Sequence, residues 1–548
     1  MTLTTTKIQD IYTNRPFRTR NADEFELQSI LDLFVDPTNG LIGPFEYDNE
    51  IIKGKMGSGK TMYLRANYAY YLYTLVPSIM ANADIILPIY IKLSDFQNMK
   101  DSESVYSSII VNIVKEMVES CRFLQSSENL SKLHNGFLTF DYGMSSRDSD
   151  IDKVIANLRL LTAEEYIEKV NKEISTSGSV GNSIFGIAAT HSKGDCTEIR
   201  QKKKPQLDDV VSAYNTLLAP FGGKLLILFD EVGSIHRTFF KEDSENSIFE
   251  VLLNQLRTLS FVRTKIAIYP QSFADILTET RYGNVVQLES NVVEESGYEV
   301  FLNSALMLIR RYICNIVENT RVEDLFDVDN AELYSIEQII NASDGNMRRF
   351  VHLVDLSMNT AFKRNNGNDK VTVEDVFMTL REHAQQMESL FPPSEREFLG
   401  NLVKVCKKRA AYQFSFPNKA LSLQKYISKS QEFNILNLIE VGAGRKSSIF
   451  SFDYAYCVLY DIPTHYTKGT ERLDKSRSRA SGERIGKVTK ITDSLIEQAS
   501  IIGKIEGEIT FLNESSTIGF VSTEEGHDCL IIFVMPTTAT RESVERLS

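Results

Sequence analysis

A short glycine-rich stretch, residues 54–61, constrains this chain more than any other feature. It reads Gly-Lys-Met-Gly-Ser-Gly-Lys-Thr and fits the pattern G-x-x-x-x-G-K-[ST] at every fixed position. Glycines let the backbone curl so that its N–H groups face a polyphosphate, the lysine reaches the terminal phosphates, and the threonine hydroxyl can hold Mg²⁺. A strand-like run precedes the stretch and a helix-like segment follows it. We therefore expect nucleoside triphosphate binding, because a helix N-terminus adds affinity for anions.

A second motif, residues 225–231, supplies the acidic half of such a site. An apolar run with the pattern of a buried strand ends in Asp230 and Glu231. We predict that Asp230 and Thr61 ligate Mg²⁺ and that Glu231 polarises the attacking water, with ATP as the substrate. Such a run is weak evidence by itself, but together with the glycine-rich loop it becomes specific. The residues expected to bind the nucleotide are Gly54, Gly57, Ser58, Gly59, Lys60, Thr61, Met62 and Asp230.

The composition indicates a soluble globular protein. The chain has 548 residues, of which 42% are hydrophobic and 24% charged, so two to four domains are expected. No apolar run is long enough to cross a bilayer and the N-terminus lacks a signal-peptide pattern, which predicts a cytoplasmic protein without a membrane partner. The 6 cysteines are scattered without metal-site spacing, which favours reduced thiols. The net charge of −13 argues against a surface that coats nucleic acid, but it permits a local basic face.

Alternating strand and helix patterns predict an α/β P-loop NTPase core with a parallel sheet. Beyond residue 300 the strand pattern stops and helices are predicted, followed by a winged-helix domain and a small C-terminal β module. The expected domains are an N-terminal linker region over 1–48, the ATPase core over 49–300 with an insertion at about 122–206, a helical lid over 301–388, a winged helix over 389–463, a basic flexible linker over 464–500 and the β module over 501–548.

Two candidate nucleic-acid surfaces lie in the C-terminal part of the chain. Helices followed by a strand pair around residues 442–446 suggest the winged helix, with Lys425 and Lys429 on a helix and Arg445 and Lys446 at the wing tip. These lysines and arginines are placed for phosphate contacts. A winged helix used only for protein contacts is an equal alternative.

The two motifs, with Gly345-Asn346-Met347-Arg348 further along, resemble the AAA+ superfamily, and most closely its origin-recognition-like and STAND-type branches. The resemblance implies that Arg348, in the G-x-x-R pattern of the lid, contacts the γ-phosphate. It also implies an arginine finger at Arg281 that enters a neighbour's site. A surface salt bridge is an equal alternative for Arg281, and Arg257 is a competing candidate for the finger. In the family a polar sensor ends the fourth strand, whereas this chain has no Asn or Thr there and offers Tyr269 or Gln271.

The tail is similar to the first three strands of cold-shock domains, which are small OB-type barrels. That similarity implies that Phe511, Phe520 and Phe533 form a stacking platform for unpaired bases. A purely structural β cap explains the same aromatic residues.

Three functions follow from these features. The first is an ATPase whose nucleotide state is coupled to homo-oligomerisation and to DNA or RNA binding. The second is a nucleotide-switched signalling scaffold that controls a separate effector protein, as in bacterial antiviral defence systems that use related ATPases. The third is an RNA-binding regulator that recognises RNA through its β tail.

Overall fold

The chain forms two compact units in a computed structural model. Unit 1 comprises Met1–Asn291, Ser296–Asp324 and Gly345–Asp355, and unit 2 comprises Val292–Glu295, Leu325–Asp344 and Leu356–Ser548. The structure describes residues 5–37, 43–124 except 82 and 100, 206–234 except 220 and 221, 248–269, 283–288, 290, 292, 295–327, 334–408, 411–416, 423–427, 434–440, 442, 447–462, 464, 488–491, 509–511, 518–522 and 528–532.

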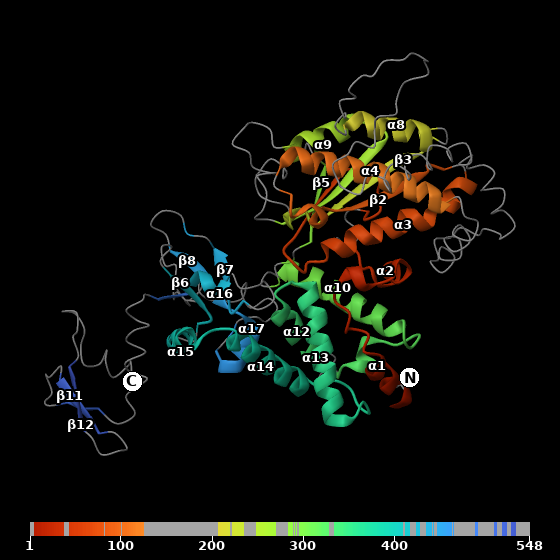
Figure 1. The fold of residues 1–548 in the computed structure, drawn as a ribbon. Helices are drawn as coiled ribbons and strands as arrows, with labels where there is room; N and C mark the ends of the chain where they lie inside the picture. The colour runs from red at the N-terminus through yellow and green to blue at the C-terminus, as the bar shows by residue number, and fades with distance from the viewer. Residues whose placement is uncertain are drawn as a thin grey trace, which may run out of the picture. The chain divides into compact units, whose positions relative to one another are not determined.

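Unit 1 contains a parallel five-stranded sheet with the order β2-β3-β4-β1-β5, which confirms the predicted α/β P-loop architecture (Figure 1). The outer strand β5 lies beside β1, and β4 separates β1 from β3. Its strands are β1 (Glu50–Lys53), β2 (Ile86–Lys92), β3 (Lys224–Asp230), β4 (Val262–Ile268) and β5 (Asn284–Gln287).

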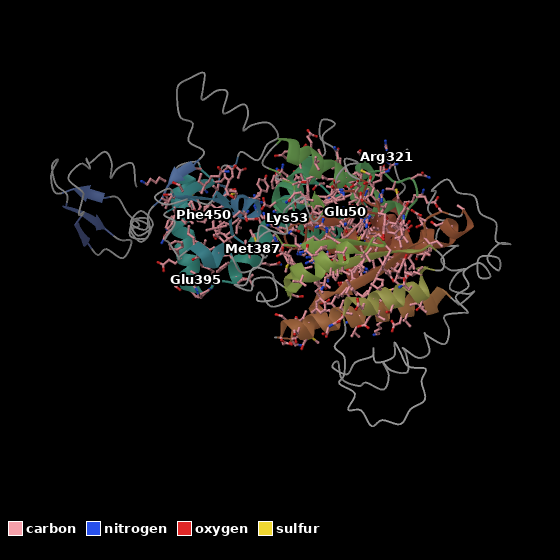
Figure 2. All side chains as sticks on the ribbon, turned by 90° about the horizontal axis from the view of Figure 1, so that it is seen from above. Glu50, Lys53, Arg321, Met387, Glu395 and Phe450 are labelled. Atoms are coloured by element: carbon pink, nitrogen blue, oxygen red, sulfur yellow. The ribbon has the colours of Figure 1, made fainter. Side chains whose placement is uncertain are left out.

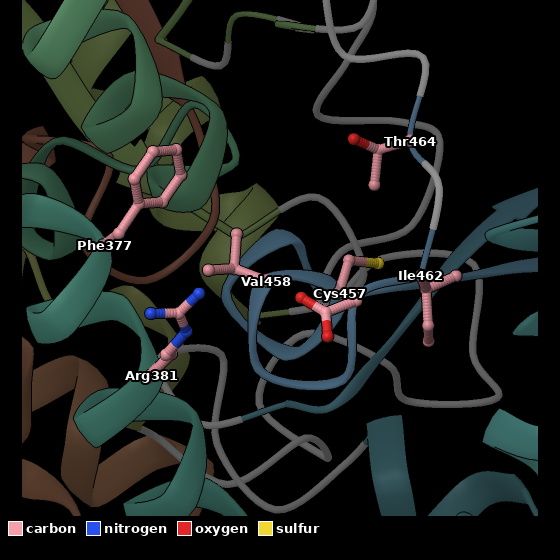
Figure 3. A pocket seen from close by; sticks show the side chains of 7 residues that line it. Phe377, Arg381, Cys457, Val458, Ile462 and Thr464 are labelled. Carbon is pink, nitrogen blue, oxygen red and sulfur yellow. The ribbon is translucent and has the colours of Figure 1, made fainter. Parts of the chain in front are cut away.

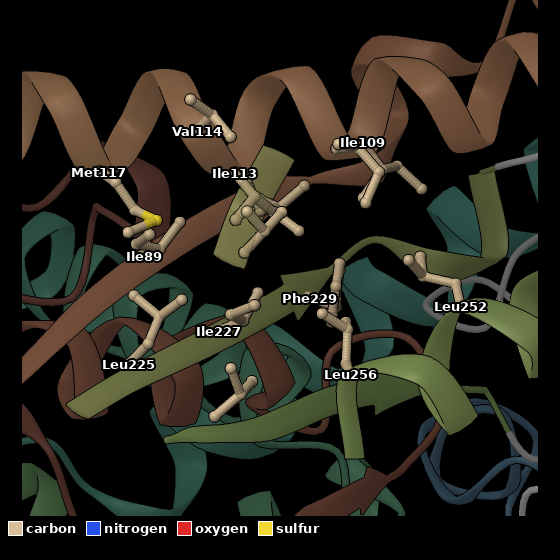
Figure 4. Close-up of a cluster of buried hydrophobic side chains, with 14 of the residues drawn as sticks. Ile89, Ile109, Ile113, Val114, Met117, Leu225, Ile227, Phe229, Leu252 and Leu256 are labelled. Carbon is tan, nitrogen blue, oxygen red and sulfur yellow. The ribbon is translucent and has the colours of Figure 1, made fainter. Parts of the chain in front are cut away.

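Helices cover both faces of this sheet, as the unbroken apolar run of β3 predicts. Alternate residues of β3 enter two different cores: Leu225 and Ile227 pack in one cluster, whereas Leu226 and Leu228 pack in the other. Figure 4 shows Ile113 and neighbouring side chains of α4 in the first cluster. The first face is covered by α4 (Ser102–Leu124), α8 (Leu207–Leu217) and α9 (Ile248–Thr258), and the second by α2 (Leu27–Leu33) and α3 (Lys60–Met80).

The N-terminal segment packs on the remaining helices of unit 1. The ring of Phe17 stacks on Tyr312 at a centroid distance of 5.2 Å. Arg15 forms a 2.8 Å ion pair with Asp355. Arg15 and Phe17 lie between α1 (Thr5–Asn14) and η1 (Ala22–Glu24), and these contacts join that segment to α10 (Glu295–Cys314) and the first part of α13 (Met347–Asn365).

A buried ion pair links the neighbouring strands β1 and β4. Glu50 and Lys265 occupy paired positions on β1 and β4, and their side chains are fully buried with 2.9 Å between the charged atoms. Figure 2 labels Glu50 among the side chains of the molecule. The Tyr63 hydroxyl donates to Glu50 Oε2 at 3.0 Å, and the Lys265 ammonium donates to the Pro44 carbonyl at 3.1 Å. Charge in the interior is tolerated here because each charged group has a partner of opposite sign and a further hydrogen bond.

Unit 2 combines helices with a four-stranded sheet of order β7-β8-β6-β9. The predicted strand pair around 442–446 is present as antiparallel β7 and β8. The helices are α12 (Tyr334–Ser343), α14 (Val373–Ser389), α15 (Pro393–Lys408), α16 (Gln424–Ile427) and α17 (Tyr454–Tyr460). The strands are β6 (Gln413–Phe416), β7 (Leu436–Glu440), β8 (Ser448–Phe452) and β9 (Val488–Lys490). The residues of α11 (Val322–Leu325) are divided between the two units after Asp324.

The structure corrects two expectations in this region. The pattern of residues 421–438 predicts one or two helices, but residues 436–438 begin strand β7, because Leu436 and Leu438 pair with Phe452 and Phe450 of β8. The expected flexible linker contains β9, which pairs with β6 in parallel and is followed by fully buried Ile491. Pairing with β6 and the burial of Ile491 therefore hold residues 488–491 at this sheet, although their sequence has no apolar period.

The tail forms an antiparallel sheet of β10 (Ile509–Phe511), β11 (Ile518–Ser522) and β12 (Asp528–Ile532). Its register pairs Phe511 with Gly519 and Thr510 with Phe520. Directly paired residues share a face and successive residues alternate, so positions 511 and 520 lie on opposite faces. The expected common stacking platform of Phe511 and Phe520 is therefore wrong, and Phe533 lies outside the described residues.

No helix in the described part of the chain has both the length and the apolarity needed to cross a membrane.

Candidate nucleotide site

The glycine-rich loop connects β1 to α3, which begins at Lys60. Gly57 and Gly59 have φ values of +83° and +99°, which side-chain-bearing residues rarely adopt. A Cβ atom at Gly54 would lie 2.2 Å from Ser58 Oγ, whereas one at Gly59 would meet no atom within 4 Å. The loop is thus tightly closed at its base and open beside Gly59, at the N-terminus of a long helix.

The Lys60 ammonium is held against the loop itself. It donates to the carbonyl oxygens of Gly54 and Lys55, each at 2.7 Å, and lies 3.9 Å from the centroid of the Tyr269 ring. The side chain is largely buried. Two carbonyl dipoles and an aromatic face hold the charge that we expect to contact phosphate.

The carboxylate of Asp230 is buried at the end of β3 and accepts one hydrogen bond on each oxygen. The Tyr90 hydroxyl of β2 donates to Oδ2 at 2.5 Å, and the backbone N–H of Glu231 donates to Oδ1 at 2.8 Å. Burial, followed by the Asp230 charge, raises the pKa of Tyr90, so Tyr90 stays protonated and remains a donor. The two donors orient the acid and leave lone pairs for a further ligand.

Glu231 has a left-handed backbone with φ of +54°. Its carbonyl oxygen accepts hydrogen bonds from Ser234, 2.9 Å from the amide nitrogen and 2.6 Å from the hydroxyl oxygen. Such backbone strain in a residue other than glycine concentrates at functional positions.

Tyr269 directly follows β4, at the position where the resemblance predicts a polar sensor. Its ring lies over Lys60, and a Cβ atom at Gly233 would come within 2.4 Å of that ring. Burial raises the pKa of Tyr269, and the nearby Asp230 and Glu231 carboxylates raise it further. The hydroxyl therefore stays protonated at neutral pH, so Tyr269 can offer both a ring face and a hydrogen bond.

The start of α13 contacts the loop. The backbone N–H of Arg348 donates to the Gly57 carbonyl at 3.0 Å, and the Asn346 side chain donates to the Met56 carbonyl at 2.7 Å. Arg348 also acts electrostatically on Tyr269, lowering its pKa against the larger effects of burial and the acids. The structure thus brings Arg348 to the same site as the loop.

The site fits a nucleoside triphosphate with Mg²⁺. Ser58 Oγ is buried and has no hydrogen-bond partner in the described structure. Thr61 and Met62 lie in the first turn of α3, and both are partly exposed. Thr61 and Asp230 are the residues that would hold the metal. A hydroxyl and a carboxylate suit Mg²⁺, which takes one or two protein oxygens together with substrate phosphates and waters. The described residues contain no cluster of three or more His, Cys, Asp or Glu side chains that could hold a metal ion.

The other predicted residues lie on other elements or outside the described part of the chain. Lys425 lies in α16, and Arg257 is an exposed residue in the last turn of α9. The residues that lie outside the described part are Arg281, Lys429, Arg445, Lys446 and Phe533.

Comparison with known proteins supports the resemblance in the first part of the chain. Residues 15–233 match the ORC-CDC6-like family model. This segment therefore resembles the origin-recognition-like AAA+ ATPases. It includes both the glycine-rich loop and Asp230.

The solved structure of the Aeropyrum pernix ORC2 protein in ADPNP–ADP complexes also matches. The alignment covers 81% of this chain and 94% of that chain, with 12% identity and a TM-score of 0.30. No curated protein matches the chain.

Two residues of the site escaped sequence reasoning. Tyr90 lies in an apolar strand and carries no motif, and Asn346 stood in the lid motif only as a neighbour of Arg348. The register of β2 with β3 and the contact of α13 with the loop reveal their positions.

A separate pocket in unit 2 is lined by apolar side chains together with Arg381 and Asp461. Figure 3 shows Arg381 beside Val458 and Phe377. None of the predicted site residues lines this pocket.

Proposed function

We propose that the chain binds and hydrolyses ATP, and that its nucleotide state controls oligomerisation and nucleic-acid binding. The observation that carries the proposal is the convergence of Lys60, Asp230 and Glu231 at the carboxyl ends of parallel strands. Ligands of open parallel sheets bind at this edge.

The geometry supports a division of labour among the residues. The loop amides and the α3 N-terminus bind the phosphates, and Lys60 moves from its carbonyl partners to the terminal phosphates. Mg²⁺, when bound, neutralises phosphate oxygens. Asp230 is held in place by Tyr90, and Glu231 accepts a proton from the attacking water. Arg348 stabilises charge on the γ-phosphate.

The test is calorimetric titration of ADP and of a non-hydrolysable ATP analogue into the intact chain, together with phosphate release from ATP. Wild-type protein should bind both nucleotides. Lys60→Ala should lose most of the affinity, because the backbone amides alone do not offset the triphosphate charge. A folded wild-type protein that takes up neither nucleotide would overturn the proposal.

Coupling to nucleic acid has its own test. ATP turnover and DNA or RNA binding should be measured together at several salt concentrations, because phosphate contacts release counterions and weaken with salt. Salt-dependent binding and stimulated hydrolysis would support the coupling. ATP binding without any response to nucleic acid would instead favour the alternative, a nucleotide-switched scaffold that controls a separate effector.

A further inference from the structure

The residues at the start of helix α13, in the predicted lid, contact adjacent positions of the glycine-rich loop, and both segments belong to unit 1. Asn346 Nδ2 donates to the Met56 carbonyl at 2.7 Å, and the Arg348 N–H donates to the Gly57 carbonyl at 3.0 Å. A Cβ atom at Gly57 would lie 2.4 Å from Asn346 Oδ1. The loop and this helix turn therefore fit together with no room for a larger residue.

The Asn346 amide serves two elements at once. Its Oδ1 accepts the Arg349 N–H at 3.1 Å at the start of α13, while its Nδ2 donates to the loop. Each end of the amide faces a partner of the correct polarity, and turning the amide over would place donor against donor and acceptor against acceptor. The helix cap therefore fixes the orientation in which Asn346 meets the loop.

These contacts determine how two peptide groups of the loop are turned. Because a trans peptide is planar, a carbonyl directed toward α13 turns the N–H of the following residue away from α13. This applies to the N–H groups of Gly57 and Ser58, and the latter donates to the Lys55 carbonyl at 3.2 Å. The curl of the loop is thus held from outside by α13 and from inside by its own hydrogen bond.

We propose that Asn346 is a positioning residue of the nucleotide site, which orients the 56–58 backbone so that the loop is formed before phosphate arrives. The inference rests on the proposed nucleotide binding and adds a role for a residue that touches the loop's outer side. Since the contact is to the loop and not to the γ-phosphate, its loss should weaken ADP and ATP binding equally. The side chain of Arg348, in contrast, should favour ATP over ADP.

Asn346→Ser is the decisive variant. Serine caps helices as well as asparagine and adds no charge, but its short side chain cannot span from the cap to the Met56 carbonyl. ADP and a non-hydrolysable ATP analogue should be titrated without Mg²⁺ into the full chain. We expect Kd to rise about tenfold for both nucleotides. Arg348→Ala retains the backbone donor and should raise the Kd of the ATP analogue more than that of ADP.

Hydrogen exchange of the nucleotide-free protein provides a readout that does not depend on any ligand. Exchange at residues 56–58 should become faster in Asn346→Ser, while the amides of α13 keep their protection. Unchanged exchange in the loop, or unchanged affinity for both nucleotides, would overturn the positioning role. If the wild-type chain binds no nucleotide, the proposed function is refuted. If loop exchange is nevertheless faster in Asn346→Ser than in the wild type, the contact between Asn346 and the loop is still supported.

Discussion

Glu231 and Asp230 are adjacent acids with different surroundings. Asp230 is buried and accepts two hydrogen bonds, whereas Glu231 is partly exposed on a left-handed backbone. We expect Glu231→Gln to lower ATP turnover by roughly 100-fold or more, since general base catalysis is worth about that much. Nucleotide affinity should remain, because glutamine retains the size and backbone of the residue. Normal turnover in this variant would show that Glu231 is not the base.

Tyr90 orients Asp230 through one hydroxyl, which Tyr90→Phe removes without changing the ring. Loss of this hydroxyl should lower the Mg²⁺ affinity of the nucleotide complex about tenfold, because removing a hydrogen bond to a metal-ligating side chain commonly has an effect of that size. The measurement is ADP affinity as a function of Mg²⁺ concentration. ADP binding without Mg²⁺ serves as the control and should not change. An unaltered Mg²⁺ dependence would exclude the orienting role.

Short sequence motifs predicted the residues that act together with their own sequence neighbours. The glycine-rich loop and the Asp230-Glu231 pair were recognisable because their chemistry requires consecutive residues of fixed type. Tyr90 and Asn346 act through space, and their partners lie on other elements. The stacking platform failed for a related reason: the face on which Phe520 lies depends on its register with β10, which residue types alone do not determine.

At the scale of elements, the Glu50–Lys265 ion pair joins β4 to β1, the strand that precedes the glycine-rich loop. Lys265→Met should destabilise these strands by about 3–5 kcal/mol, because it leaves a buried carboxylate without its cation. Urea unfolding followed by hydrogen exchange at the β1 and β4 amides measures this loss. Adding Glu50→Gln removes the charge and retains an acceptor for Tyr63, so the double variant should recover much of it. A double variant with a lower free energy of unfolding than Lys265→Met would contradict this explanation.

Helix α13 contains a histidine that makes stability depend on pH. Burial, with a smaller contribution from Arg20, lowers the pKa of His352 to about 4. The unfolded chain takes up a proton near pH 6.5 and the folded chain does not, so stability present above pH 6.5 is lost as the pH falls toward 4. The expected loss is about 1–3 kcal/mol, allowing for partial exposure. His352→Gln should show a shallower pH dependence in denaturation experiments between these two values, and an identical profile would exclude His352.

For the whole molecule, the sequence predicted the type of the sheet but not the order of its strands. A parallel sheet followed from the alternating pattern, but residue types do not specify that β4 lies between β1 and β3. That insertion places Tyr269 beside Lys60. Likewise, β9 joins the sheet by pairing three residues with β6, which is far from it in sequence, and a signal of this length is too short to recognise in advance.

Hydrolysis should require more than one copy of the chain if Arg281 acts on a neighbour. Arg281→Ala should bind ATP and fail to hydrolyse it, and Lys60→Ala should do neither. A mixture of the two should regain turnover, because the first supplies an intact site and the second an intact arginine. Arg257→Ala, mixed in the same way, distinguishes the two arginines. Mixtures that stay inactive would argue against a shared site.

The lid helix has one further mechanical consequence. Helix α13 has 19 residues, and at about 1.5 Å per residue it is a rod of roughly 28 Å whose first turn is fastened to the glycine-rich loop. A tilt of about ten degrees at Asn346 would sweep its last residue through about 5 Å. A shift of a few tenths of an ångström among the phosphate-facing amides would thus move the far end of α13 by a distance comparable with the pitch of one helical turn.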